Sequence, residues 1–90
     1  MKRYYLIYSG IVQGVGFRWR IMNIANRYGL TGTAKNLSNG DVEVQVQGNV
    51  ESFAEFLKES LSPDRFIEIN DYSIKEIDLV DNEKRFNVIY

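Results

Sequence analysis

The stretch "SGIVQGVGFRWR", residues 9–20, contains the point at which the chain changes from one backbone periodicity to another. Residues 3–11 are rich in tyrosine and isoleucine, a composition typical of a strand. From Phe17 onward the apolar side chains recur at helical spacing, namely at Phe17, Ile21, Ile24, Ala25 and Tyr28. Gly14 and Gly16 lie between the two patterns. The stretch therefore predicts a strand, a glycine-containing loop and a helix.

The chain that follows this stretch predicts two strands joined by a hairpin turn. Gly29 follows the first helical stripe at the position where a left-handed residue often ends a helix. Residues 30–36 are extended in character, and Asn39-Gly40 is a hairpin signal. The next segment alternates strictly: Val42, Val44 and Val46 point one way, and Asp41, Glu43, Gln45 and Gln47 point the other. In the first strand, Tyr4, Leu6 and Tyr8 share one face.

A second helix and the terminal strands complete the pattern. Asn49 is a suitable N-cap for a helix whose predicted buried stripe is Val50, Phe53, Ala54, Leu57 and Leu61. Residues 66–80 and 85–90 read as strands, separated by a turn at Asp81 to Lys84. The order β-α-β-β-α-β plus a terminal strand predicts an α+β, ferredoxin-like split βαβ sandwich. We expect one domain over residues 1–90, with an antiparallel sheet and two helices on one face.

The composition excludes several classes of function. With eleven basic and twelve acidic side chains the net charge is −1, which does not favour a general nucleic-acid binder. The chain has no cysteine and no histidine, so disulfides, thiolate chemistry and the Ser–His or Cys–His nucleophile pairs are excluded. The N-terminal segment lacks the features of a signal peptide, and no apolar segment is long enough for a membrane helix. We therefore expect a cytoplasmic protein that binds neither nucleic acid nor a membrane.

The loop between the first strand and the first helix is a candidate anion site. The first amides of a helix have no intrahelical partner, and the helix dipole favours an anion there. Gly14 and Gly16 would let these amides converge, and Arg18 follows with a planar, two-pronged donor. The stretch is neither a Walker A loop, which needs Gly-Lys-Ser/Thr, nor a dinucleotide fingerprint, since Trp19 replaces the third glycine. From the residues alone, a flexible turn with a solvated arginine is an equal alternative.

Two ordered motifs resemble the signatures of the acylphosphatase family. "GIVQGVGFR", from Gly10 to Arg18, is similar to the family signature Gly-x-Val-Gln-Gly-Val-x-Phe/Tyr-Arg. "KNLSNGDVE", from Lys35 to Glu43, is similar to the second signature, in which an asparagine precedes Asp/Asn-Gly and Val-Glu. The C-terminal "FNVIY" resembles the closing strand of the family. The resemblance covers essentially the whole chain and implies a ferredoxin-like hydrolase of acyl phosphates.

The resemblance also implies roles for individual residues. Arg18 corresponds to the phosphate-binding arginine and Asn36 to the asparagine that positions the attacking water, so these two are the expected catalytic residues. The backbone of the preceding loop would bind the phosphate of the substrate through Gln13, Gly14, Val15, Gly16 and Phe17. The resemblance implies a small-molecule acyl phosphate as substrate, inorganic phosphate as product, and neither a metal nor another cofactor. We expect a monomer.

Several side chains near these motifs have less specific expectations. Gln13 is expected to brace the loop through its side chain, and Arg20 and Lys35 to be solvated surface charges. Trp19 lies off the buried stripe, and it either packs at a sheet edge or lines the entrance of the site. The chain departs from the family at Thr33-Ala34, where an aromatic residue and a valine are common, and at Ile89, where a basic residue is frequent. We expect none of these departures to touch Arg18 or Asn36.

Two other functions remain open at this point. The same fold with tyrosines on its first strand could bind single-stranded RNA by base stacking. However, the segment "GVGFRW" lies in a loop rather than on a central strand, and the net charge is negative. The chain could also be an acylphosphatase-like module that handles carbamoyl phosphate within a larger maturation protein. Because no further domain follows Tyr90 in the sequence, we expect a free-standing enzyme.

Overall fold

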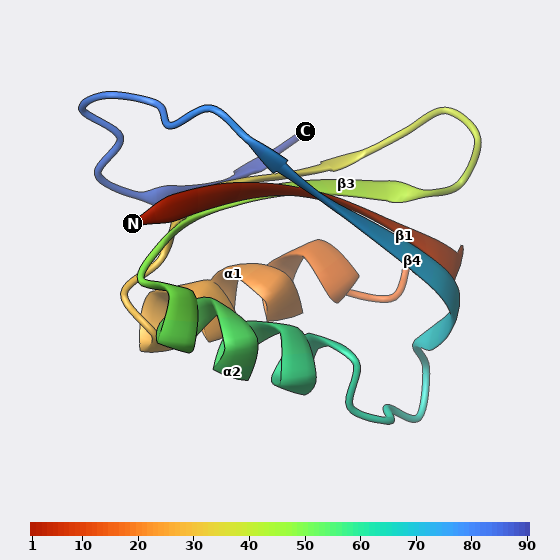
Figure 1. Ribbon diagram of the computed structural model, residues 1–90. Helices are drawn as coiled ribbons and strands as arrows, with labels where there is room; N and C mark the ends of the chain where they lie inside the picture. The colour runs from red at the N-terminus through yellow and green to blue at the C-terminus, as the bar shows by residue number, and fades with distance from the viewer.

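The computed structural model describes residues 1–90 and places two helices on one face of a five-stranded sheet (Figure 1). The expected ferredoxin-like α+β arrangement is confirmed. The sheet has the strand order β4-β1-β3-β2-β5. The elements are β1 (Lys2–Ile11), α1 (Phe17–Arg27), β2 (Thr31–Asn36), β3 (Val42–Gly48), α2 (Val50–Ser60), β4 (Glu68–Ile77) and β5 (Phe86–Ile89).

The sheet is mixed, because its last strand pairs in parallel. The pairs β1–β3, β1–β4 and β2–β3 are antiparallel, as expected. In contrast, β5 lies beside β2 in parallel register, with Gly32 opposite Phe86. Since β4 runs opposite to β1 and β2, a reversal of the chain after β4 gives β5 the direction of β2. The C-terminal end of β5 is thereby brought beside the end of β2.

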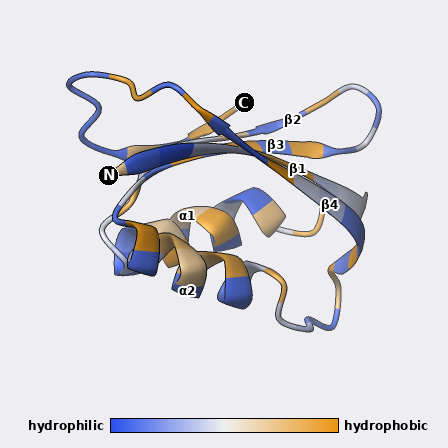
Figure 2. Ribbon diagram, in the orientation of Figure 1, coloured by the Kyte–Doolittle hydropathy of each residue, from blue (hydrophilic) through white to orange (hydrophobic).

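The core lies between the sheet and the helices. Val42, Val44 and Val46 are fully buried, as their alternation predicted, and Leu6 and Tyr8 of β1 share this inner face. Both helix ribbons alternate between hydrophobic and hydrophilic residues (Figure 2), and the buried apolar side chains of the helices belong to the same core cluster. The buried residues of α1 are Phe17, Ile21, Ile24 and Ala25, which matches the predicted stripe apart from half-buried Tyr28.

Helix α2 buries part of its predicted stripe: Phe53 is buried, and Leu57 and Leu61 pack against the core. Val50 and Ala54 are exposed, and the buried residues are Phe53, Phe56 and Ser60. Two tyrosines of β1 explain this orientation. The Tyr4 ring stacks on the Phe53 ring at a centroid distance of 3.9 Å, and the hydroxyls of Tyr8 and Ser60 are 2.7 Å apart in the core.

Both predicted helix boundaries that depend on a specific residue are confirmed. Gly29 has a φ of 69°, and the amide of Leu30 bonds back to the Ala25 carbonyl at 2.9 Å, which closes α1. At the start of α2, the side chain of Asn49 accepts hydrogen bonds from the amides of Glu51 and Ser52. Neither helix is long and apolar enough to span a membrane.

The strand predicted over residues 66–80 spans only Glu68–Ile77 in the structure, and residues 78–85 form the loop that leads to β5. Gln47 binds both backbone polar groups of Val80 through its side chain. Arg3 is only 3% exposed and donates to Glu83 at 2.8 Å and to Gln47 at 3.2 Å. These hydrogen bonds connect the loop to β1 and β3 and thereby position the residues that precede β5.

Candidate active site

The loop that precedes α1 turns at two glycines with left-handed backbone. Gly14 and Gly16 have φ values of 73° and 79°, and no atom lies within 4 Å of where their Cβ atoms would be. The first hydrogen bond of the helix joins the Arg20 amide to the Gly16 carbonyl at 3.0 Å, so the amides before Arg20 have no intrahelical partner. The first turn of α1 also lacks an acidic side chain. This helix end is therefore electropositive and uncapped.

A cavity of about 180 Å³ opens against this loop. It brings together the two expected catalytic residues, Arg18 from the first turn of α1 and Asn36 from the end of β2. We refer to it as the loop cavity. Its lining consists of Val12, Gly14, Gly16, Phe17, Arg18, Trp19, Asn36, Val88 and Tyr90.

Arg18 is held by the last residues of the chain. Its Nη1 donates a hydrogen bond of 2.7 Å to the backbone carbonyl oxygen of Ile89, and its guanidinium lies 4.8 Å from the centroid of the Tyr90 ring. Residue 89 thus contacts Arg18 through its backbone carbonyl, a contact that does not depend on the side chain in which this chain departs from the family. A guanidinium has five N–H donors, so this single contact leaves donors that can bind a phosphoryl group.

Asn36 presents a buried acceptor without a partner. It ends β2 opposite Val42, where the hairpin begins. Its Oδ1 is buried and accepts no hydrogen bond from any protein group. A buried amide oxygen in this state lacks a stabilisation of about 1 kcal/mol or more that a partner would supply. The site is therefore suited to a donor from outside the protein, such as a water molecule.

The other loop residues divide between bracing and packing roles. The side-chain amide of Gln13 donates to the carbonyls of Leu37 and Asp41 at 2.7 and 2.8 Å, which ties the loop to the β2–β3 hairpin. The Gln13 side chain is thus engaged away from the loop cavity, as a brace. Val15 packs against the core, and the ring of Phe17 is buried. Of the five expected substrate-binding residues, Gly14, Gly16 and Phe17 therefore line the loop cavity, whereas Gln13 and Val15 do not.

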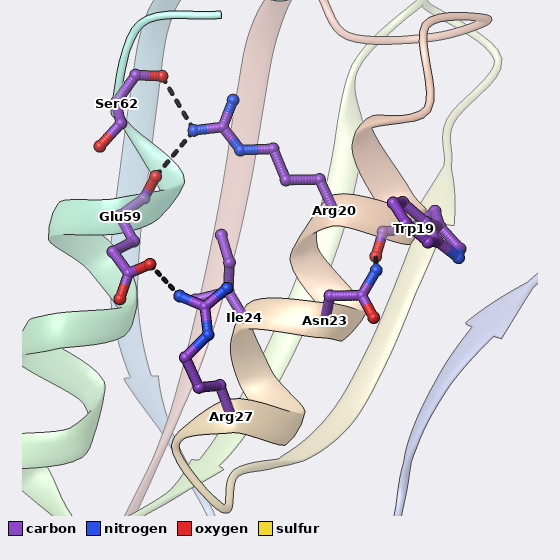
Figure 3. Close-up of a pocket in the computed structure, with 7 residues that line it drawn as sticks. All are labelled: Trp19, Arg20, Asn23, Ile24, Arg27, Glu59 and Ser62. Atoms are coloured by element: carbon purple, nitrogen blue, oxygen red, sulfur yellow. Dashed lines mark hydrogen bonds and ion pairs between the residues drawn. The ribbon is translucent and has the colours of Figure 1, made fainter.

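Trp19 lines the entrance of the loop cavity rather than a closed sheet edge, and its side chain is 65% exposed. In Figure 3 its ring lies on the side of α1 away from α2, whereas Arg20 and Arg27 reach toward α2. The expectation that Arg20 is a solvated surface charge was wrong, because its guanidinium donates to the carbonyls of Glu59 and Ser62 at 2.8 and 2.9 Å. It thereby caps the end of α2. Lys35 is exposed.

The larger hollow between α1 and α2, about 570 Å³, is a structural junction. Its charged residues satisfy one another: the carboxylate of Glu59 accepts hydrogen bonds from Arg27 and from the Tyr28 hydroxyl. The bond from Tyr28 lowers the pKa of Glu59, and the same bond raises the pKa of Tyr28. The groups that could bind an anion here are thus occupied by protein partners. Nor does any cluster of three or more carboxylates offer a metal site.

Comparison with known proteins identifies the family. A family model described as acylphosphatase matches residues 4–88. The chain belongs to the acylphosphatase family. It is 39% identical to an acylphosphatase of Clostridium acetobutylicum over 90 residues, which covers 100% of this chain and 99% of the relative. An acylphosphatase of Clostridium beijerinckii is 40% identical, with both chains covered completely. The resemblance inferred from the motifs is confirmed, and the chain is a hydrolase of acyl phosphates.

Solved acylphosphatase structures have the same fold. The crystal structure of acylphosphatase from Bacillus subtilis matches with a TM-score of 0.93 at 31% identity and covers both chains completely. T. kodakarensis HypF matches with a TM-score of 0.88 at 31% identity, but this chain covers only 12% of that protein. The fold thus also occurs as part of a longer chain. Of the tyrosines that the RNA-binding alternative invoked, Tyr4 and Tyr8 face the core and offer no stacking surface on the open face of the sheet.

Proposed function

We propose that the loop cavity is the active site and that it hydrolyses the carboxyl-phosphate bond of an acyl phosphate. The observation that carries this proposal is that Arg18, the uncapped start of α1 and Asn36 line one small cavity, and that the buried Oδ1 of Asn36 has no protein partner. The backbone of residues 13–18 and the free donors of Arg18 would bind the three non-bridging phosphoryl oxygens. Both groups stabilise the charge that develops on these oxygens in the transition state.

Asn36 would position the nucleophile. Its buried Oδ1 can accept a hydrogen bond from a water molecule and orient the oxygen of that water toward phosphorus. An amide is too weak a base to remove the proton. As the oxygen of water bonds to phosphorus, the bond from phosphorus to the acyl oxygen breaks, and the electron pair leaves with the carboxylate. The proton of the water passes to a non-bridging phosphoryl oxygen, which gives inorganic phosphate.

The chemistry explains why the chain needs no histidine. A carboxylate is a good leaving group that requires no protonation at neutral pH, so a general acid is dispensable. What remains is positioning and electrostatic stabilisation, which together account for most of the catalysis in phosphoryl transfer. We therefore propose a reaction without metal or other cofactor. We further propose that the substrate is a small molecule and that the chain acts as a monomer.

The test is hydrolysis of benzoyl phosphate at neutral pH in the presence of a chelator. We expect turnover by the parent chain, loss of both turnover and phosphate inhibition in Arg18→Ala, and loss of turnover alone in Asn36→Ala. Turnover that survives in Arg18→Ala would place the reaction at another site. If Asn36→Ala lost turnover and phosphate binding to the same degree, the water-positioning role would be wrong.

A further inference from the structure

The loop cavity is too small to enclose a complete acyl phosphate that has a large acyl group. Pockets that bury most of a drug-sized ligand usually measure about 300 Å³ or more, whereas the loop cavity measures about 180 Å³. If the phosphoryl group binds between the loop and Arg18, as proposed above, the acyl group must lie at the cavity mouth. The residues at the mouth therefore decide which acyl groups bind well.

Two aromatic side chains form this mouth. Trp19 is 65% exposed and Tyr90 is 98% exposed, and every other side chain in the lining is buried or half-buried. The Tyr90 ring already lies against the guanidinium of Arg18. The indole of Trp19, in contrast, takes part in none of the ring stacks or cation–π contacts of the structure. The side chain of Asn23 donates to the backbone carbonyl of Trp19 at 3.0 Å, not to its indole.

The position of Trp19 is suited to contact with the acyl group. It follows Arg18 directly in the first turn of α1, so its ring is carried by a rigid element. Its ring lies on the side of the helix away from the Arg20 and Arg27 contacts, although Trp19 also lines the hollow between α1 and α2 (Figure 3). A single exposed aromatic residue would need no explanation. Here the exposed ring is adjacent to the candidate phosphate ligand and lines the same cavity.

We infer that Trp19 is a specificity-determining residue that binds the acyl group of the substrate and favours planar, aromatic acyl groups over small ones. This inference rests on the proposed function of the loop cavity. A flat acyl group can stack on the indole face, and such contacts add to the free energy gained by burying the ring. A small acyl group such as acetyl reaches little of this surface. The contact would be present both in the bound substrate and in the transition state, so it should act mainly on KM.

The test compares benzoyl phosphate with acetyl phosphate as substrates. We expect Trp19→Ala to lower kcat/KM for benzoyl phosphate about tenfold, mainly by raising KM. The value for acetyl phosphate should change by about twofold or less. Trp19→Phe should retain most of the preference, because it keeps a ring. Phe66→Ala is the matched control: Phe66 is 67% exposed but does not line the cavity, so the ratio should not change.

The fluorescence emission of Trp19 reports ligand binding without turnover. Trp19 is the only tryptophan in the chain, so the signal comes from this residue alone. Benzoylphosphonate has a carbon–phosphorus bond in place of the acyl oxygen–phosphorus bond that the enzyme would cleave. Its binding should shift the emission to shorter wavelength as it covers the exposed indole. Equal losses for both substrates in Trp19→Ala, or an unchanged emission at inhibitory concentrations of benzoylphosphonate, would overturn the inference. A parent that hydrolyses neither substrate, or an Arg18→Ala variant that hydrolyses both normally, would instead overturn the proposed function.

Discussion

Arg18 and Ile89 are joined by a hydrogen bond of 2.7 Å from a guanidinium nitrogen to a backbone carbonyl oxygen. The acceptor is a main-chain atom, so it is present whatever side chain occupies position 89. The bond fixes the guanidinium plane at the cavity, and the Tyr90 ring lies against it. A preorganised donor of this kind loses little conformational freedom when it binds a phosphoryl group.

We expect Arg18→Lys to be far less active than the parent although it keeps the positive charge. A lysine ammonium is a compact point charge, and it cannot bond to Ile89 and present a planar pair of donors at the same time. The expected loss is about 100-fold or more in kcat/KM. Arg27→Lys is the matched control, because Arg27 lies in the hollow between the helices. Comparable losses in the two variants would argue against a specific role for Arg18.

Gly16→Ala should weaken both stability and phosphate binding. With a φ of 79° at this position, a Cβ atom destabilises the folded state by about 1–2 kcal/mol. Gly29→Ala is matched for backbone conformation, with a φ of 69° and open space around it, but lies at the far end of α1. Thermal unfolding should show similar losses for the two variants. Only Gly16→Ala should raise the inhibition constant of inorganic phosphate.

Asn36→Leu should abolish activity without destabilising the protein. The Oδ1 atom it removes is buried and has no partner, so the protein loses no hydrogen bond from that atom. We expect the free energy of unfolding to stay the same or to rise by about 1 kcal/mol. Urea denaturation measures this difference. A marked loss of stability would mean that Asn36 has a structural role instead.

Arg3→Ala should be strongly destabilising, by about 3–5 kcal/mol, because it leaves the largely buried carboxylate of Glu83 without its cation. The neighbouring pair provides a control. Lys2 and Glu76 are 3.3 Å apart, but both are about half exposed, so Lys2→Ala should cost no more than about 1 kcal/mol. If urea denaturation showed equal effects for the two variants, burial would not be the reason for the strength of the Arg3 contact.

The Glu59 cluster predicts a dependence of stability on acidic pH. The hydrogen bond from Tyr28 holds the pKa of Glu59 below its ordinary value of 4.5, so the unfolded chain binds a proton at higher pH than the folded one. The stabilisation is therefore complete above about pH 4.5 and decreases as the pH falls through the folded pKa. Glu59→Gln should flatten the change of Tm with pH in this range. An unchanged slope would show that Glu59 does not contribute.

Features that depend on one local chemical requirement could be predicted from the sequence. Gly29 closes α1 because an L residue with a side chain is strained at positive φ, and Asn49 caps α2 because its side chain reaches two free amides. The alternation from Val42 to Val46 identified the buried face of β3 in the same way. Two sequence motifs predicted that Arg18 and Asn36 belong to one site, and both residues line one cavity.

Features that depend on contacts between distant segments could not be predicted. Apolar residues occur on more than one face of α2, and the orientation that buries Phe56 and exposes Ala54 includes contacts of Phe53 and Ser60 with the distant tyrosines of β1. Arg18 and Ile89 are 71 positions apart, so no local pattern signals their hydrogen bond. For Trp19, the sequence showed only an aromatic residue next to Arg18 that lies off the buried stripe of the helix. It did not distinguish packing from ligand contact.

The Arg3–Glu83 contact, which joins residues 80 positions apart, also bears on how quickly the chain reaches this structure. The strand β1 pairs with β3, where Lys2 lies opposite Gly48, and with β4, where Arg3 lies opposite Ile77. Few of these contacts are local, so the entropy of closing long loops is lost before they form. We therefore expect folding on a scale of about milliseconds to seconds rather than microseconds. The 78–85 loop, which needs β1 and β3 already in place, should close among the last steps.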